Sequence, residues 1–406
     1  MGYRRVAVTG LGAVSALGHN VPELWESLKA GRSGIGPLEH VDRTKLRFQN
    51  GAEVRNFNPQ AHFDAKRADM LDRFAQFAVV AAREAVADAG IAWTPELRER
   101  TCIVTGTSIG GEAAQDQGFF ELYRENRNRV HPLTVPRVMP NAGSSHISME
   151  FGITGPVYTI STACSSSNHS IGQAFWMVRS GLVDAAIAGG TEAPLTFGHL
   201  KAWEALRVVS LTTCRPFSKN RDGMILGEGG AMIVLEPLEL AVARGIHIYA
   251  EIVGLGMSAD AFHLTQPSPE GASRAVRSAL KDGEVPPDQV GYINAHGTAT
   301  LVNDTMETSV IRKVFGDHAE RLAISSTKSM HGHALGGAGA LEAVATVLAL
   351  HHGILPPTAN FTEPDPACNL DVIPNKARQV QVEYALSHSF AFGGLNAVLA
   401  FRRWGN

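Results

Sequence analysis

Short apolar segments rich in Val, Ile and Ala alternate with longer alanine-rich segments along the whole chain. Runs of four to nine apolar or small residues bounded by Gly, Ser or Pro are typical of buried strands. They predict strands at 5–10, 102–106, 157–161, 185–190, 231–237, 248–256, 290–296, 322–327, 384–390 and 397–403. The longer segments predict helices at 72–89, 165–180, 271–281 and 337–352. Strands that alternate with helices indicate an α/β architecture with buried sheets.

The two halves of the chain resemble each other. Two pairs of segments correspond in the same order, 4–18 with 247–261 and 158–172 with 322–336. In this register Cys164 aligns with Lys328, and each follows a predicted strand and precedes a helix. Such internal similarity indicates a duplicated unit. We therefore predict two similar α/β halves, 1–246 and 247–406, with a site between them.

One polar segment, 112–137, is the longest without a clear hydrophobic period. We expect it to be a lid or an interface loop. A glycine-rich turn at 10–18 suggests a dinucleotide loop, but Ser15 stands where the third glycine of that motif belongs. A plain turn after the first strand is the better interpretation.

Composition and charge narrow the class of protein. The 406 residues are 44% hydrophobic and 18% charged, and the net charge is −3, which does not favour a nucleic-acid-binding protein. No window approaches the ~18 apolar residues of a membrane span. The four cysteines are far apart and form no disulfide or metal-binding pattern; they are Cys102, Cys164, Cys214 and Cys368. We expect a cytoplasmic protein that binds neither membrane nor nucleic acid.

Cys164 is a candidate nucleophile. A lone cysteine is most often a buried apolar residue, but Cys164 lies between a predicted strand and the start of a predicted helix. The helix N-terminus stabilises a thiolate, and its N–H groups can bind an oxyanion. This setting favours the nucleophile over the space-filling alternative.

Residues that could assist Cys164 follow other strands. His296 ends a strand and precedes Gly297, and Lys328 and His333 lie in a glycine-rich turn before a helix. The turn lacks the spacing of a phosphate loop, and His331 with His333 lacks a complete set of zinc ligands. We therefore predict no metal site. The segment around Phe392, AFGGLN, is either a hairpin turn or a glycine loop that reaches the site.

Several motifs, in order, resemble those of the β-ketoacyl-acyl-carrier-protein synthases, most closely the class II condensing enzymes of bacterial fatty-acid synthesis. They are VTGLGAVSALG, TACSSS, AGGTEA, RPFSKNRDGMILGEGG, HGTAT, STKSM and FGG. The resemblance covers essentially the whole chain. It implies a thiolase-like fold, in which two duplicated α/β halves form five αβαβα layers, and a dimeric assembly. It also implies decarboxylative Claisen condensation of malonyl-carrier protein with an enzyme-bound acyl thioester.

The resemblance also implies roles for individual residues. Cys164 would carry the acyl group, and the N–H groups of His296 and His333 would stabilise the enolate that forms on decarboxylation. Lys328 would support the electrostatics together with Glu307, and the backbone N–H groups of Cys164 and Phe392 would form the oxyanion hole. The remaining implied contacts are Thr298 and Thr300 for pantetheine, Ile109 and Trp203 for the acyl chain, and Lys66, Arg67, Arg124, Arg127, Arg129 and Arg207 for an acidic carrier protein.

Four positions depart from the family pattern. His331 replaces a common threonine, Ala391 and Leu395 replace a glycine and a threonine beside Phe392, and Asp69 lies among the carrier-docking residues. Alanine has fewer backbone conformations than glycine, so we expect a restricted gate at Phe392 and a specialised acyl substrate.

Other functions remain as alternatives. The first is the catalytic ketosynthase subunit of a type II polyketide synthase, which would form a heterodimer with a chain-length-factor homologue instead of a homodimer. A thiolase acting on coenzyme A would need a second catalytic cysteine where Lys328 and the two histidines stand. A non-catalytic chain-length factor would have lost Cys164. We expect no cofactor beyond the phosphopantetheine of the acyl carrier protein.

Overall fold

The computed structural model describes residues 2–405. Its main sheet has ten strands, in the order β10-β9-β13-β14-β8-β1-β7-β6-β4-β5. Along the chain these are β1 Val6–Ser15, β4 Thr101–Gly106, β5 Val157–Ile160, β6 Ala185–Glu192, β7 Gly229–Pro237, β8 Ala250–Ala259, β9 Val290–Asn294, β10 Ala323–Ser325, β13 Tyr384–Ala391 and β14 Leu395–Arg403. Each of the ten predicted strands coincides with one of them. Two further pairs are only two residues long, β2 Gly36–Pro37 with β3 Asn50–Gly51 and β11 Ile354–Leu355 with β12 Arg378–Gln379.

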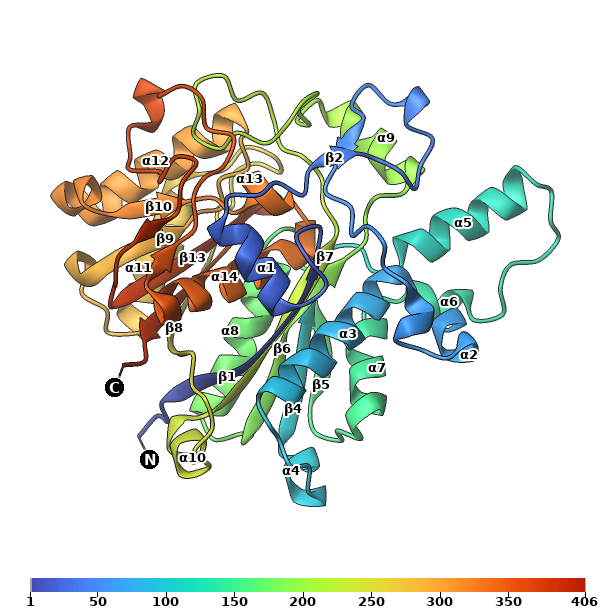
Figure 1. The fold of residues 1–406 in the computed structure, drawn as a ribbon, viewed down its shortest axis with the longest axis horizontal. Helices are drawn as coiled ribbons and strands as arrows, with labels where there is room; N and C mark the ends of the chain where they lie inside the picture. The colour runs from blue at the N-terminus through green and yellow to red at the C-terminus, as the bar shows by residue number, and fades with distance from the viewer. Residues whose placement is uncertain (1, 406) are drawn as a thin grey trace.

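Helices connect these strands (Figure 1). They are α1 Val21–Lys29, α2 Ala65–Asp69, α3 Arg73–Asp88, α4 Pro95–Glu99, α5 Glu112–Tyr123, α6 Thr134–Val138, α7 Ala142–Phe151, α8 Ser166–Arg179, α9 Phe197–Leu206, α10 Leu238–Ala243, α11 Pro269–Asp282, α12 Leu301–Phe315, α13 Lys328–His331 and α14 Ala338–His352. The four helices predicted from the sequence correspond to α3, α8, α11 and α14.

The strand order confirms the duplication. The N-terminal half of the sheet runs β5-β4-β6-β7-β1, and the C-terminal half runs β10-β9-β13-β14-β8. In both halves the first three strands are parallel and the last two pair antiparallel. The segments matched in the sequence therefore form equivalent strands, β1 with β8 and β5 with β10. A short antiparallel pairing of Val6–Val8 with 250–252 joins the halves.

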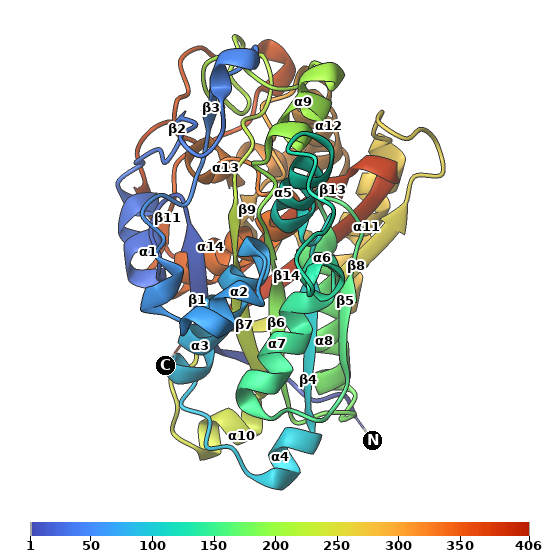
Figure 2. The same ribbon diagram turned by 90° about the vertical axis from the view of Figure 1, so that its right-hand side faces the viewer.

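The elements form five layers (Figures 1 and 2). Helices α8 and α14 lie in the middle and pack against strands of both halves. Helices α3 and α7 cover the outer face of the N-terminal strands, while α11, with α12 beside it, covers the outer face of the C-terminal strands. Almost every residue of α14 is buried, as expected for a helix that is apolar on all sides and lies between the two halves of the sheet.

The prediction of a loop at 112–137 is wrong over most of its length. Residues 112–123 form α5 and 134–138 form α6, and only the stretch between them lacks regular structure. Figure 1 shows α5 projecting from the body of the molecule. No residue of α5 is buried, and its Phe119, Phe120 and Tyr123 are exposed. The helix therefore has no buried stripe, which is the signal that a hydrophobic period detects.

Within residues 2–405, no helix is both long enough and apolar enough to cross a membrane. The boundary placed at 246/247 falls between α10 and β8 and stays a prediction.

Candidate active site

A cavity of about 410 Å³ lies between the two halves of the molecule. Its walls come from the end of β5, from α9, from the loops after β8, β9 and β10, and from the segment after β13. Eight of the residues singled out in the sequence line it: Cys164, Trp203, Arg207, His296, Thr298, Thr300, His333 and Phe392. The structure thus brings together residues that lie up to 228 positions apart (164 to 392).

Cys164 lies one residue before the N-cap of α8, so that its side chain is next to the helix N-terminus. The preceding Ala163 has a φ of 51°, a left-handed conformation that marks a sharp strand-to-helix turn. The thiol is buried, and the backbone N–H of Phe392 lies close enough to lower its pKa. Burial nevertheless raises its pKa to about 11, although Lys328 and the Phe392 N–H act in the opposite direction. Desolvation therefore outweighs the helix N-terminus and the donors, and the resting group is a thiol.

His296 and His333 form a buried pair, called here the histidine pair. Their ring centroids are 5.5 Å apart and the ring planes are nearly perpendicular, at 84°. Burial holds the pKa of both well below 6.5, and the positive charge of Lys328 lowers it further. Both rings are therefore neutral at pH 7, and each has one N–H to donate. Neither Nδ1 atom has a hydrogen-bond partner within residues 2–405.

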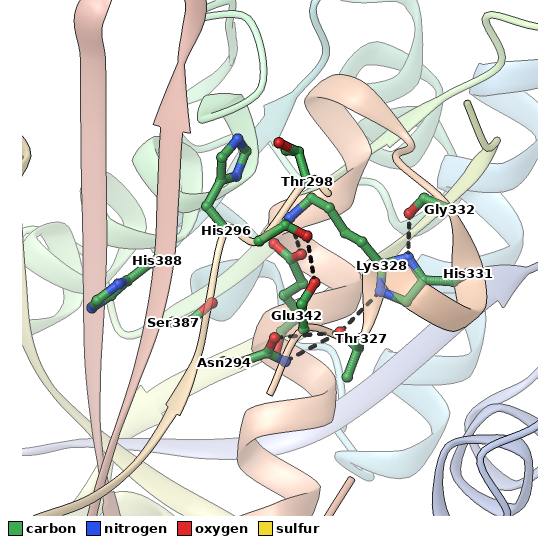
Figure 3. Close-up of polar contacts among 12 residues, drawn as sticks. Asn294, His296, Thr298, Thr327, Lys328, His331, Gly332, Glu342, Ser387 and His388 are labelled. Atoms are coloured by element: carbon green, nitrogen blue, oxygen red, sulfur yellow. Dashed lines mark hydrogen bonds and ion pairs between the residues drawn. The ribbon is translucent and has the colours of Figure 1, made fainter. Parts of the chain in front are cut away.

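Lys328 lies behind the cavity and does not line it. Its side chain is fully buried and forms an ion pair with Glu342 of α14 (Figure 3). The prediction that Lys328 acts together with Glu307 is therefore wrong as far as the ion pair is concerned, because the carboxylate that contacts Lys328 is that of Glu342. Burial raises the pKa of Glu342 to about 7, and the Lys328 ammonium opposes this. The signal for Glu342 was present in the sequence, since a single carboxylate in an otherwise apolar helix needs a buried partner.

Glu307, on α12, supports the loop that carries His296. Its carboxylate accepts hydrogen bonds from the backbone N–H groups of His296, at 2.9 Å, and Gly297, at 2.8 Å. It also contacts Nδ1 of His388, at 3.1 Å. Glu307 therefore fixes the main chain of a cavity residue without reaching the cavity itself.

The remaining cavity residues form the entrance. Thr298 and Thr300 share a hydrogen bond of 3.0 Å between their hydroxyl groups. The indole of Trp203 stacks on the ring of Phe392, with centroids 5.9 Å apart and planes 22° apart. The indole also donates a 2.7 Å hydrogen bond from Nε1 to Nε2 of His199. Trp203 is buried and Phe392 is exposed, and both rings line the cavity.

Ile109 belongs to the apolar cluster that contains Cys164 and Trp203. It is held there by Glu192, a buried carboxylate that the sequence analysis missed. Glu192 accepts hydrogen bonds from the backbone N–H groups of Ser108, Ile109 and, on the other half, Gly336. It therefore ties the loop after β4 to the turn that follows His333.

Comparison with known proteins agrees with this geometry. The family model "Beta-ketoacyl synthase, N-terminal domain" matches residues 3–241, and "Beta-ketoacyl synthase, C-terminal domain" matches residues 249–362. The chain belongs to the β-ketoacyl synthase family. It is therefore an acyltransferase-type condensing enzyme with the thiolase-like fold that the sequence motifs implied.

Three relatives cover nearly the whole synthase chain. "Nodulation protein E" of Rhizobium sp. (strain N33) is 46% identical over 98% of this chain and 99% of its own length. The "3-oxoacyl-[acyl-carrier-protein] synthase 2" of Staphylococcus aureus (strain COL) is 42% identical over 99% of both chains. The solved structure described as "The ishigamide ketosynthase/chain length factor" has a TM-score of 0.93 and 37% identity, and the match covers 100% of both chains.

The basic residues of this synthase form two separate groups. Arg207 lies at the end of α9 and lines the cavity. The others lie away from it, Lys66 and Arg67 on α2 and Arg124, Arg127 and Arg129 in the stretch after α5. A 2.9 Å contact between Asp69 and His131 joins these two elements. Arg67 pairs with Glu150, and Arg127 pairs with Glu121 and Glu125. Within residues 2–405, the four basic residues without an ion pair are Lys66, Arg124, Arg129 and Arg207.

The departures from the family pattern are accommodated without strain. His331 is buried, and its ring nitrogens contact Thr327 Oγ1 at 3.0 Å and the Gly332 carbonyl at 2.8 Å. Leu395 packs in the apolar cluster of Cys164. Ala391 has a φ of −99°, which any residue adopts, whereas the following Gly393 has a φ of 82°. Flexibility at this loop therefore rests on Gly393 and its neighbour Gly394.

Proposed function

We propose that the chain extends an acyl group by two carbons through decarboxylative condensation with malonyl-carrier protein. The observation that carries the proposal is that Cys164 and the neutral histidine pair line the same cavity. A nucleophile suits transfer of the acyl group, and two neutral N–H donors suit an enolate. The carrier-protein substrate is supported by the name of the Staphylococcus aureus relative, a 3-oxoacyl-[acyl-carrier-protein] synthase.

In the first half-reaction, Cys164 attacks the thioester carbonyl of an acyl-carrier protein. The Cys164 Sγ–carbonyl bond forms, the carrier thiol leaves with a proton, and the acyl group stays on the enzyme. Because the pKa of the thiol is raised to about 11, its proton leaves during the attack and not before it. The backbone N–H groups of Phe392 and Cys164, which lie at the thiol, would stabilise the negative charge that develops on the carbonyl oxygen.

In the second half-reaction, malonyl-carrier protein loses carbon dioxide and forms an enolate. The N–H groups of His296 and His333 hold its oxygen, and the enolate carbon attacks the acyl carbonyl. The bond to Cys164 breaks and the sulfur is protonated again. Lys328, paired with Glu342, supports this step because its charge adds to burial in keeping both rings neutral. Thr298 and Thr300 would hold the pantetheine arm, and Ile109 and Trp203 the acyl chain.

We further propose a dimer that works in the cytoplasm with no cofactor of its own. Strand β5 is an edge of the sheet, and Met149 and Tyr158 beside it are exposed, which leaves backbone and apolar groups for a second chain. All four cysteines are free thiols, as in a reducing compartment. Acyl and malonyl groups would arrive on the phosphopantetheine of the carrier protein, which would dock on the basic residues described above.

The partner chain distinguishes the second candidate function. The ishigamide structure is described as a ketosynthase/chain length factor, which favours a heterodimer of this chain with a chain-length-factor homologue. Native mass spectrometry of the chain expressed alone separates the two. A homodimer that condenses on its own supports the first candidate, and a chain active only with a homologous partner supports the second.

Intact-mass analysis tests the proposed reaction. The chain is incubated with carrier proteins that bear short, medium and long acyl groups, and then with malonyl-carrier protein. A thioester adduct on wild type but not on Cys164→Ala, followed by a β-ketoacyl product, is expected. No adduct with any carrier or partner would refute the assignment. Loss of decarboxylation in His333→Ala, with Cys164 acylation retained, is expected for the second half-reaction.

A further inference from the structure

His388 is a fully buried histidine that the proposed reaction does not use. It lies on β13, which pairs in parallel with β9, the strand that leads to His296. Its Nδ1 contacts Glu307 Oε1 at 3.1 Å, and its Nε2 is buried with no hydrogen-bond partner within residues 2–405. Figure 3 shows it on its strand, near the loop of His296. A buried polar group placed in this way needs an explanation.

Glu307 depends on this contact. Its carboxylate is fully buried, and no Lys or Arg among residues 2–405 pairs with it, since Lys328 pairs with Glu342 and Arg221 with acidic residues elsewhere. Its other donors are the N–H groups of His296 and Gly297 and a weak 3.4 Å contact from Asn303. His388 is therefore its one side-chain donor at ordinary distance. A buried carboxylate that loses such a donor reorients to find another.

We infer that His388 is a positioning residue for His296, acting through Glu307. The chain of contacts is short: the His388 ring orients the Glu307 carboxylate, and the carboxylate fixes the main chain at His296 and Gly297. This inference rests on the proposed function, because it assigns His388 to the decarboxylation half-reaction.

The acylation half-reaction does not share this support. Cys164 and the α8 N-terminus belong to the other half of the molecule. The Phe392 N–H follows β13, whose main chain pairs with β14 along its whole length and with β9 over its first four residues. A change in the His388 side chain leaves that backbone pairing in place. The inference therefore predicts that the two half-reactions respond differently.

Two substitutions separate the hydrogen bond from the rest of the ring. His388→Leu fills the space but removes the donor to Glu307. His388→Asn retains a nitrogen the same number of bonds from Cβ as Nδ1, so it can still donate to Glu307. His318→Leu is the matched control, because His318 is in the same half but contacts the Val290 carbonyl. Unfolding by urea is measured for all three.

The readouts are Cys164 acylation, followed by intact mass, and carbon dioxide release from malonyl-carrier protein by the acylated enzyme. For His388→Leu we expect kcat for release to fall about 10- to 100-fold, the effect of misplacing a reacting group by roughly 1 Å. KM for malonyl-carrier protein and the rate of acylation should stay near wild type, and His388→Asn should restore release.

Any of three results with the His388 variants would overturn the inference, namely unchanged release in His388→Leu, equal loss of release and acylation, or failure of His388→Asn to restore release, and a fourth comes from the control. Equal loss of release in His318→Leu would also overturn it, because the effect would then not be specific to Glu307. A wild-type protein that neither accepts an acyl group nor decarboxylates malonyl-carrier protein would instead refute the proposed function. The two failures are thus distinguishable.

Discussion

The raised pKa of Cys164 gives a quantitative prediction for its reactivity with iodoacetamide. With a pKa of about 11, the thiolate fraction is about one in ten thousand at pH 7 and about one in a hundred at pH 9. Relative to the ordinary value of 9.0, the thiolate is disfavoured by about 3 kcal/mol, which is the net effect of burial against Lys328 and the nearby N–H groups. The alkylation rate should therefore rise about tenfold for each pH unit across this range, with no plateau. Substrate acylation should remain efficient, because the donors around the thiol act on the charge that forms during attack.

Intact mass and peptide mapping measure the alkylation rate at each pH. Cys164→Ala is the control for site specificity. The other thiols should react more slowly, because they are buried away from the cavity and burial raises the pKa of Cys102 and Cys214 to about 12 and that of Cys368 to about 11. A Cys164 rate that levels off below pH 9 would show a thiolate already formed at neutral pH. The helix N-terminus and the Phe392 N–H would then lower the pKa of Cys164 by more than burial raises it, which would refute the prediction.

Three further predictions concern the entrance, the buried ion pair and pH. Trp203→Leu removes a ring stack worth about 0.5–1.5 kcal/mol, so Phe392 should move away from the cavity more often and the acyl-enzyme should hydrolyse faster. Intact-mass analysis measures the lifetime of the acyl-enzyme, with Trp203→Phe as the control. An unchanged lifetime in Trp203→Leu would contradict a closing role for the stack. Lys328→Met leaves Glu342 buried and unpaired and should lower the free energy of unfolding, measured with urea, by about 3–5 kcal/mol. The double variant Lys328→Met/Glu342→Leu should recover much of that loss. An equal loss of stability in the single and double variants would count against a stabilising ion pair. Burial lowers the pKa of the histidine pair well below 6.5. The rate of carbon dioxide release should therefore be independent of pH from 6.5 to 9. A rise or fall of this rate centred near pH 6.5 would show that one of the two rings titrates in that range.

Local patterns were sufficient to predict most of the fold. The strands were predicted because each is a short, mostly apolar run, and all but the edge strand β5 are largely buried in a layered α/β molecule. Helices α3, α8, α11 and α14 were predicted because they carry a buried stripe or are apolar throughout, whereas α12, of 15 residues, was not predicted. Helix α5 was missed because none of its residues is buried and its aromatic residues are exposed, so no apolar stripe marks it.

The candidate site was predicted in part. Cys164, His296 and His333 could be singled out because each follows a strand, in a turn rich in small residues, and strand ends of an α/β fold converge on a site. The predicted partner of Lys328 was wrong because Glu307 on α12 and Glu342 on α14 are both carboxylates, and their order along the chain does not show which of them contacts the lysine. Only packing decides that Glu342 contacts the lysine while Glu307 contacts the His296 main chain.

The sequence by itself determined the elements, the duplication and the identity of the reactive side chains, because these depend on composition, periodicity and the order of residues along the chain. Tertiary structure alone decided the ionisation of those side chains and their partners. Burial made Cys164 a resting thiol and the histidine pair neutral, and a contact across 81 positions joined His388 to Glu307. Desolvation and hydrogen bonding depend on every element that surrounds a group, and no local segment of the chain contains that information.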